Sequence, residues 1–242
     1  MLWDKDDLAR YERWHATPAG TYALTQECRL LERLTAGWPR RGRTLLDVGC
    51  GPGVFLEFFH NAGFDVTGFD NSPVMLEASR ERLGNRAELH LGDGRALPYD
   101  DDEFDYVVLL NVLEFVSQPQ AVLAEATRVA KHGLLVGYLN FFSLYRLEAH
   151  KHTLLGKARW FSPWAMRGLV RSVAGAAPMR EAGVLFGPPC TWREGFHLWG
   201  LGRLILPLPV GAFCALTVDL AAEPPFTSLP AWTASAQPTK SF

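Results

Sequence analysis

The sequence has few cysteines and no long hydrophobic run. Its four cysteines lie far apart and form no C-x-x-C pair, which predicts reduced thiols and no disulfide framework. No apolar stretch reaches the roughly 18 residues that a membrane span needs, and the opening residues MLWDKDDLARYERWH lack the apolar core of a signal peptide. We therefore expect a cytoplasmic protein without a transmembrane segment.

The chain also lacks an excess of charge of either sign. Its 24 lysines and arginines nearly balance 26 aspartates and glutamates, which leaves a formal net charge of -2. A nucleic-acid-binding surface needs a basic excess, so no nucleic acid is expected as a partner. With 242 residues, 48% of them hydrophobic, the chain is long enough to bury a large core.

Short apolar segments alternate with amphipathic ones along most of the chain. Expected strands lie at 44–48, 64–70, 87–93, 104–110 and 134–140. Expected helices lie at 4–15, 19–36, 54–63, 71–84 and 117–133. Strands and helices that alternate at this spacing are typical of βαβ units. The predicted fold class is therefore α/β, with a mostly parallel sheet between two layers of helices.

The pattern loosens in the last hundred residues. A helix is expected over 162–174 and two late strands over 183–187 and 211–218. The end of the chain, EPPFTSLPAWTASAQPTKSF, is rich in proline, serine and threonine, so residues 221–242 are expected to form a poorly ordered tail. Residues 1–220 are then expected to form a single domain.

The segment LLDVGCGPG, from Leu45 to Gly53, places three glycines directly after the first expected strand. Glycine permits unusual dihedrals and a close approach of the backbone to a ligand. The start of the following helix offers free N–H groups and the positive end of its dipole. In open parallel sheets, ligands bind beyond the carboxyl ends of the strands. Gly49, Gly51 and Gly53 are therefore expected to cradle a cofactor.

Three features indicate which cofactor this is. The spacing is G-x-G-x-G, not the G-x-G-x-x-G of dinucleotide-binding folds. Asp47 stands two residues before the first glycine, where a carboxylate would repel a pyrophosphate but suit a cationic amino-acid group. Asp70 ends the second expected strand, where a carboxylate can bind both ribose hydroxyls. A ribose at Asp70 and a cation near Asp47 favour S-adenosylmethionine over a dinucleotide.

Four segments occur in order over residues 44–140: LLDVGCGPGVF, GFDNSPVML, LGDGRALPYDDDEFDYVVLLNVLEFV and LLVGYLN. In these segments the chain resembles the class I S-adenosylmethionine-dependent methyltransferases, especially their small-molecule branch (type 11, similar to quinone-biosynthesis enzymes). The resemblance implies a Rossmann-like, seven-stranded sheet whose last strand, residues 211–218, runs antiparallel. It also implies methyl transfer from S-adenosylmethionine, with S-adenosylhomocysteine as the product.

The resemblance assigns residues to the methionine and ribose parts of the cofactor by matching positions. It implies that the turn Gly49-Cys50-Gly51 faces the methionine part. Asp47 and Gly53 flank that turn and are expected to belong to the same site. Asp70 is implied to bind the ribose hydroxyls.

Further residues are implied around the rest of the cofactor: Asn71, Met75, Asp93, Gly94, Leu110 and Asn111. Asn71 and Met75 are implied to lie beside the adenine. Asp93 is implied to accept a hydrogen bond from the adenine amino group, with a backbone contact from Gly94. Leu110 and Asn111 are implied to lie under the cofactor.

Methyl transfer from a sulfonium is an in-line displacement, so positioning can supply much of the acceleration. A general base is needed only where the acceptor must lose a proton. The resemblance implies no single catalytic residue, and the candidates near the acceptor are His15, Tyr11 and Tyr145. The acidic run 100–103 is expected to be a solvated turn, so no metal site is expected.

Aromatic residues are expected to shape the pocket for the methyl acceptor. They come from an N-terminal helical cap over residues 1–40 and from a lid insertion over residues 141–165. The residues concerned are Tyr11, Trp14, His15, Tyr22, Phe141, Phe142, Tyr145, Trp160 and Trp164. An aromatic lid that excludes water favours a small, partly apolar acceptor. The same rings could instead form core between the lid and the sheet.

Two other functions stay open on the sequence. One is a nicotinamide-dependent oxidoreductase on the same kind of sheet, and the other is a protein that binds S-adenosylmethionine without turnover. Phe115 stands where the family often has histidine, which leaves the acceptor chemistry open. The acceptor atom is oxygen, nitrogen or carbon. Exposed apolar surface in the last third of the chain would permit a homodimer.

Overall fold

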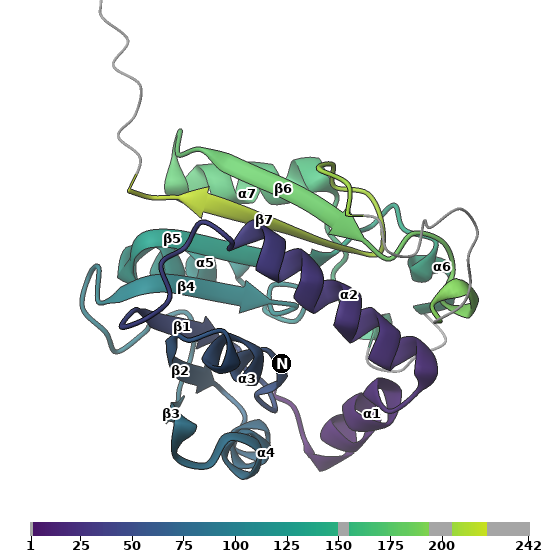
Figure 1. Ribbon diagram of the computed structural model, residues 1–242, viewed down its shortest axis with the longest axis horizontal. Coiled ribbons are helices and arrows are strands. Elements are labelled where there is room, and N and C mark those ends of the chain that lie inside the picture. The colour runs from purple at the N-terminus through teal and green to yellow at the C-terminus, as the bar shows by residue number, and fades with distance from the viewer. Residues whose placement is uncertain (1, 150–154, 194–204, 222–242) are drawn as a thin grey trace, which may run out of the picture.

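A seven-stranded sheet with helices on both of its faces forms the computed structural model of the protein (Figure 1). The structure describes residues 2–149, 155–193 and 205–221. The expected tail, residues 221–242, therefore lies outside the described residues except for its first. No helix in the described parts is both long and apolar enough to cross a membrane.

The elements follow the predicted alternation closely. The strands are β1 (Thr44–Val48), β2 (Asp65–Asp70), β3 (Ala87–Leu91), β4 (Phe104–Leu110), β5 (Ala130–Leu139), β6 (Met179–Val184) and β7 (Phe213–Asp219). The α-helices are α1 (Lys5–His15), α2 (Pro18–Leu34), α3 (Val54–Asn61), α4 (Pro73–Leu83), α5 (Pro119–Val129), α6 (Tyr145–Ala149) and α7 (Pro163–Ala174).

The strand order in the sheet is β3-β2-β1-β4-β5-β7-β6. The first five strands pair in parallel, whereas β7 runs antiparallel to both β5 and β6. The predicted seven-stranded sheet with an antiparallel last strand is confirmed. Because β1 to β5 are parallel, their carboxyl ends meet at one edge of the sheet, where open α/β folds bind ligands.

The core has two halves because successive residues of a strand face opposite sides of the sheet. In β1, Leu45 packs in the half beneath α2, α3 and α4, and Leu46 packs in the half beneath α5 and α7. Both leucines are fully buried. In Figure 1, α2 crosses the front of the sheet while α5 and α7 lie behind it. The fold is therefore the three-layer arrangement that the alternation predicts.

Two predicted boundaries are wrong. The helix expected over 117–133 ends at Val129, and β5 begins at once with Ala130 in extended backbone. Gly133, which resembled a helix stop, is a strand residue: a Cβ there would lie 3.1 Å from the ring of Trp38, so only glycine leaves room for that ring. The late strand expected over 183–187 instead spans Met179–Val184.

The N-terminal segment crosses the edge of the sheet and is held there by a hydrogen bond. Asp4 caps α1 by accepting from the N–H of Asp7, and Thr17 caps α2 by accepting from that of Gly20. The backbone carbonyl of Trp3 accepts a hydrogen bond of 2.7 Å from the hydroxyl of Ser72, which also caps α4. This contact holds the start of the chain over the carboxyl ends of β1 and β2.

Candidate functional site: a cavity at the carboxyl ends of the strands

A cavity of about 610 Å³ opens at the carboxyl ends of the parallel strands, within the size range of small-molecule sites. Its floor is formed by residues at or just after the ends of β1 to β5, and its roof by side chains of α1 and α2. The strand order reverses between β1 and β4, so the cavity lies at the topological switch point of the sheet. This is the expected place for a ligand.

The glycine turn after β1 lines the cavity with backbone. The N–H of Gly49 donates to the carbonyl of Phe69 over 2.6 Å, and the N–H of Gly51 donates to Oδ2 of Asp70 over 2.9 Å. Gly51 has a φ of +53°, and a Cβ there would meet no atom within 4 Å. Its Cα surface is therefore open to a ligand.

The other two glycines of the turn leave room for neighbouring side chains of the protein. A Cβ on Gly49 would lie 2.5 Å from the side chain of Val112, and one on Gly53 would lie 2.5 Å from the hydroxyl of Ser79. Gly53 starts α3 with a φ of +78° and is not among the residues that line the cavity. All the other predicted cofactor-binding residues line the cavity.

Asp47 is a buried carboxyl at the end of β1 with 2% of its surface exposed. Its Oδ1 has no hydrogen-bond partner among the described residues. Burial, with a smaller contribution from the nearby Asp70, raises the pKa of Asp47 to about 8. Cys50 lies behind it, and burial likewise raises the pKa of that thiol. Asp47 is thus an acceptor whose charge needs a cation.

Asp70 ends β2 and ties two loops together. Its Oδ2 accepts from Gly51 and its Oδ1 from the N–H of Ser72 over 2.8 Å. Each carboxylate oxygen can accept a second hydrogen bond, so the group keeps capacity for two hydroxyls. The next residue, Asn71, is exposed at the cavity rim, whereas Met75 is buried in its wall.

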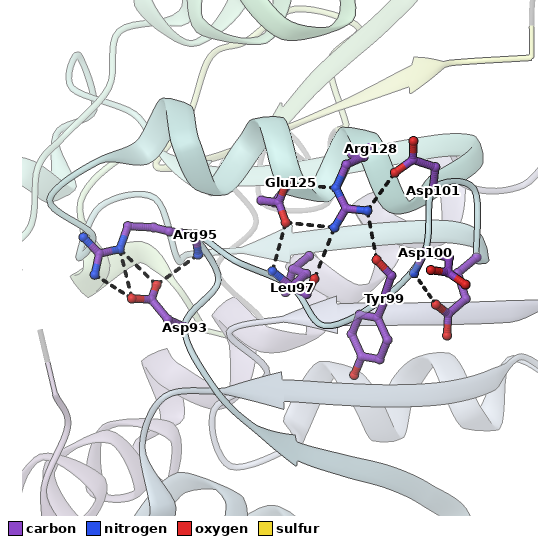
Figure 2. Close-up of polar contacts among 9 residues, drawn as sticks. Asp93, Arg95, Leu97, Tyr99, Asp100, Asp101, Glu125 and Arg128 are labelled. Atoms are coloured by element: carbon purple, nitrogen blue, oxygen red, sulfur yellow. Dashed lines mark hydrogen bonds and ion pairs between the residues drawn. The ribbon is translucent and has the colours of Figure 1, made fainter.

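Asp93 lies at the rim beyond β3 and is paired with Arg95 (Figure 2). The guanidinium donates three hydrogen bonds to the two carboxylate oxygens, and the backbone N–H of Arg95 adds a fourth of 2.9 Å. These bonds lower the pKa of Asp93 to about 2. Gly94 lies between them and lines the cavity over Val48 and Val122.

Arg128 on α5 holds the loop that follows Asp93 (Figure 2). Its guanidinium donates to the carbonyls of Leu97 and Tyr99 and to the carboxylates of Asp101 and Glu125. Glu125 in turn accepts from the N–H of Leu97 over 2.9 Å. The acidic run 100–103, predicted as a solvated turn, is thus held near its start by hydrogen bonds from Arg128.

Leu110 and Asn111 end β4 on the cavity floor. Asn111 has a φ of +55°, a left-handed conformation that asparagine tolerates better than most residues. Its N–H donates to the carbonyl of Gly137 over 3.0 Å, while its buried Oδ1 lacks a partner in the described parts of the chain. The unpaired oxygens of Asn111 and Asp47 are two acceptors that a ligand can satisfy.

The catalytic candidates Tyr11, His15 and Tyr145 all line the cavity. The rings of Tyr11 and His15 are 4.2 Å apart. Burial lowers the pKa of His15 to about 4 and raises that of both tyrosines. All three are therefore neutral at pH 7, and the buried Nδ1 of His15 has no partner within the described structure.

The comparisons with known proteins agree with this geometry. Residues 46–136 match the family model described as a methyltransferase domain. Over these residues the chain is similar to a methyltransferase domain. The antiparallel β7 and this match argue against a nicotinamide-dependent oxidoreductase, whose dinucleotide fold has a parallel sheet in the order 3-2-1-4-5-6.

Relatives of the methyltransferase domain include proteins described only as uncharacterized methyltransferases. One from Mycobacterium tuberculosis is 36% identical over 135 residues, which are 55% of this chain and 51% of the relative. One from Mycolicibacterium gilvum is 38% identical over 119 residues, 49% and 46% of the two chains. The matched part therefore spans about half the length of these relatives.

Solved structures share the fold over most of the chain. One is described as a methyltransferase from Thermotoga maritima, "possible histamine N-methyltransferase"; it has 24% identity, a TM-score of 0.70, and coverage of 88% of this chain and 95% of that one. Another is the magnesium protoporphyrin IX methyltransferase of Synechocystis with bound S-adenosylhomocysteine, at 16% identity and a TM-score of 0.64, covering 89% and 94%. Both likenesses establish the methyltransferase fold.

Several of the aromatic residues predicted for a lid lie outside the cavity of the methyltransferase domain. The exposed fractions of Phe141, Phe142 and Trp164 are 38%, 62% and 70%. Their rings pack on one another instead, with centroids 5.2 Å apart for the two phenylalanines and 5.7 Å for Phe142 and Trp164. Trp160 and Tyr22 pack against the core without lining the cavity. From the predicted lid, Tyr145 and Leu155 line the cavity.

Sequence reasoning missed several cavity residues, among them Trp3, Glu27, Phe115 and Trp192. The rings of Trp3 and Phe115 pack edge to face with their centroids 5.2 Å apart, and both residues line the cavity. Glu27 could have been found, because it recurs at helical spacing with the buried Ala23 and Leu31 of α2. Charged residues are rarely buried, so a glutamate on the buried face of a helix is a candidate site residue.

Proposed function

We propose that this protein is an S-adenosylmethionine-dependent methyltransferase that acts on a small, partly apolar molecule. The observation that carries the proposal is the cluster at the ends of β1, β2 and β4. There the open backbone of Gly51, the unpaired buried oxygens of Asp47 and Asn111, and the carboxylate of Asp70 all face one cavity.

The residues present fit this cofactor. Asp47 offers a carboxylate that only a cation can keep charged, which suits the amino group of the methionine part. Asp70, held by two backbone N–H groups, has acceptor capacity left for the ribose hydroxyls. Met75 supplies an apolar wall beside Asn71 for the adenine, and Asp93 with Gly94 closes the rim.

When bound, the cofactor supplies a methyl group already activated on a sulfonium. The protein then has to hold the acceptor in line with that group and keep water out, and positioning of this kind can provide much of the acceleration. The rings of Tyr11, Trp14 and Tyr145 line the site and would pack against a bound acceptor. His15 has an unpaired nitrogen and a pKa of about 4, which makes it an acceptor of hydrogen bonds but a poor base.

The acceptor is a small molecule in this proposal because the cavity has a volume of about 610 Å³ and is mostly aromatic or aliphatic beyond the cofactor residues. The balanced net charge gives no support to a nucleic acid. The Synechocystis relative in fold is described as acting on a porphyrin and the Thermotoga one as possibly acting on histamine, both small molecules. A homodimer stays a prediction.

Isothermal titration with S-adenosylmethionine, S-adenosylhomocysteine and the oxidised nicotinamide dinucleotide tests the proposal. We expect micromolar binding of the first two and none of the third. Binding of the dinucleotide alone would overturn the assignment. If the first two bind, incubation with S-adenosylmethionine and a small-metabolite extract distinguishes an enzyme from a binding protein, because only an enzyme forms S-adenosylhomocysteine faster than the no-extract control.

A further inference from the structure

The cavity continues past the cofactor residues toward the other half of the sheet. There it is walled by side chains at the ends of β5, β6 and β7 and by two aromatic residues from loops and α6: Leu139, Leu185, Phe213, Tyr145 and Trp192. This second part is apolar, and the helix that covers it is α2, which packs against β6 and β7. A methyl acceptor placed beside the cofactor would occupy it.

Glu27 is the acidic side chain that α2 contributes to this cavity. It is 7% exposed, and none of the described residues forms a hydrogen bond or an ion pair with its carboxyl. It lines the same cavity as Tyr11 and Tyr145, whose pKa values are raised by burial and, to a smaller extent, by the charge of Glu27. Burial raises the pKa of Glu27 to about 7. An unpaired buried acid costs stability unless a ligand pairs with it.

Aromatic rings line the same cavity as Glu27. Tyr145 lies with its centroid 4.9 Å from that of Trp192 and 6.5 Å from that of Trp14. The faces of tryptophan and tyrosine rings attract ammonium groups, most strongly where water is excluded. A carboxylate beside aromatic rings combines a charge for an ammonium with a surface for its carbon atoms.

We propose that Glu27 binds the protonated nitrogen of the methyl acceptor, so that the acceptor is a small amine and the methyl group goes to nitrogen. This inference rests on the proposed function and narrows its substrate class. Asp47 is separately available for the amino group of the cofactor, since it stands beside the glycine turn at the end of β1. An anionic acceptor would be repelled by Glu27.

The chemistry balances with Glu27 as the base. The acceptor ammonium gives one proton to the carboxylate, which frees the lone pair of the nitrogen. That lone pair forms the N–C bond to the methyl carbon as the C–S bond breaks, and the electron pair of the broken bond stays on sulfur. The products are a methylated ammonium, a thioether and protonated Glu27, which returns its proton to solvent.

The first experiment compares amines with neutral molecules of the same shape. The purified protein, saturated with S-adenosylhomocysteine, is titrated with methylammonium, benzylamine, 2-phenylethylamine and tryptamine, and with the corresponding alcohols. We expect at least one amine to bind about tenfold more tightly than its alcohol, because a desolvated ion pair and cation–π contact add to the shared apolar contact. No preference for any amine, in a protein that binds S-adenosylhomocysteine, would overturn the proposal.

The second experiment assigns the preference to Glu27. E27Q keeps the size of the side chain and removes its charge, and E32Q makes the same change at an exposed position of α2. We expect E27Q to lose the amine preference and E32Q to keep it, with the affinity for S-adenosylhomocysteine unchanged in both. A preference that survives in E27Q would contradict the proposal.

The affinity for S-adenosylhomocysteine separates two further results. If it falls about tenfold in a folded E27Q protein, Glu27 serves the cofactor's amino group and the proposal is wrong. If the wild-type protein does not bind S-adenosylhomocysteine at all, the proposed function itself fails, which is a different outcome from binding without amine preference.

Discussion

Gly51 and Asp70 are joined by a hydrogen bond of 2.9 Å from the backbone N–H of the glycine to Oδ2 of the carboxylate. The bond connects the glycine turn after β1 to the end of β2. One residue thus both shapes the backbone that faces a ligand and offers a carboxylate to it. The two parts of the site cannot shift independently.

Asp70→Ala removes this link and the ribose acceptor together. We expect cofactor affinity to fall by about 1–3 kcal/mol, the cost of leaving buried polar groups without a partner. Isothermal titration with S-adenosylhomocysteine measures it. Asp65→Ala, at the exposed start of the same strand, is the matched control and should bind normally. An unchanged affinity in Asp70→Ala would contradict the ribose assignment.

Gly51→Ala tests whether the open backbone at the turn is where the ligand lies. Gly42 is the matched control, because it too has a positive φ (+68°) and no atom within 4 Å of an added Cβ, but it stands before β1 and does not line the cavity. Both alanine variants should lose stability by a similar amount, about 1–2 kcal/mol, from the left-handed backbone. Only Gly51→Ala should lower cofactor affinity, by about tenfold or more, because its methyl group enters the cavity. Equal affinities in the two variants would place the ligand elsewhere.

The cofactor half of the site could be placed from the sequence because short strands and glycine turns leave local patterns. Asp47 and Asp70 lie at the ends of β1 and β2, and Asn111 directly follows β4. The apolar runs of these strands are readable in the sequence, and parallel strands bring their ends together. Gly53 was assigned to the ligand with the other glycines, but its need for space comes from Ser79 on α4. That contact joins two helices and leaves no local pattern.

The acceptor half could not be placed in the same way. Trp192 comes from a loop after β6 and meets Tyr145 of α6 only through the tertiary fold. Phe142 and Trp164, which composition alone put in a lid, turn outward and pack on each other. Aromatic content predicts that rings pack together, but not on which side of a backbone they do so.

Arg128→Ala should destabilise the loop that carries the rim of the site. The arginine satisfies two backbone carbonyls and two carboxylates, which would all lose a charged donor, so we expect a loss of about 1.5–3 kcal/mol in the free energy of unfolding. Arg80, which forms an exposed ion pair with Glu77 on α4, is the control, and its alanine variant should lose less than about 0.5 kcal/mol. Urea unfolding measures both. A loss in Arg128→Ala as small as the control would show that the loop holds without it.

The stability of the cofactor-free protein should fall as the pH rises from 6.5 to 8. Burial raises the pKa of Asp47 to about 8 and those of Glu27 and Glu114 to about 7, so the folded state binds more protons than the unfolded state throughout this range. His15, with a pKa of about 4, acts in the opposite direction, but the unfolded state binds only about half a proton there at pH 6.5 and less above it, which the three acids outweigh. Thermal unfolding in the absence of cofactor checks the trend, and Asp47→Asn should flatten it. A Tm that rises over this range would contradict the burial of these acids.

The same carboxyl predicts a proton release on cofactor binding. A cation beside Asp47 favours its ionised form, and a group with a pKa of about 8 is mostly protonated at pH 7, so binding should release close to about one proton. Titration with S-adenosylmethionine in buffers of different ionisation enthalpy measures the number, and Asp47→Asn should abolish it. The cofactor should accordingly bind more tightly as the pH rises toward 8, while the empty protein becomes less stable. Asp47, a buried acid that lacks a partner until the cofactor's amino group arrives, contributes to both trends, and binding without proton release would mean that this amino group lies elsewhere.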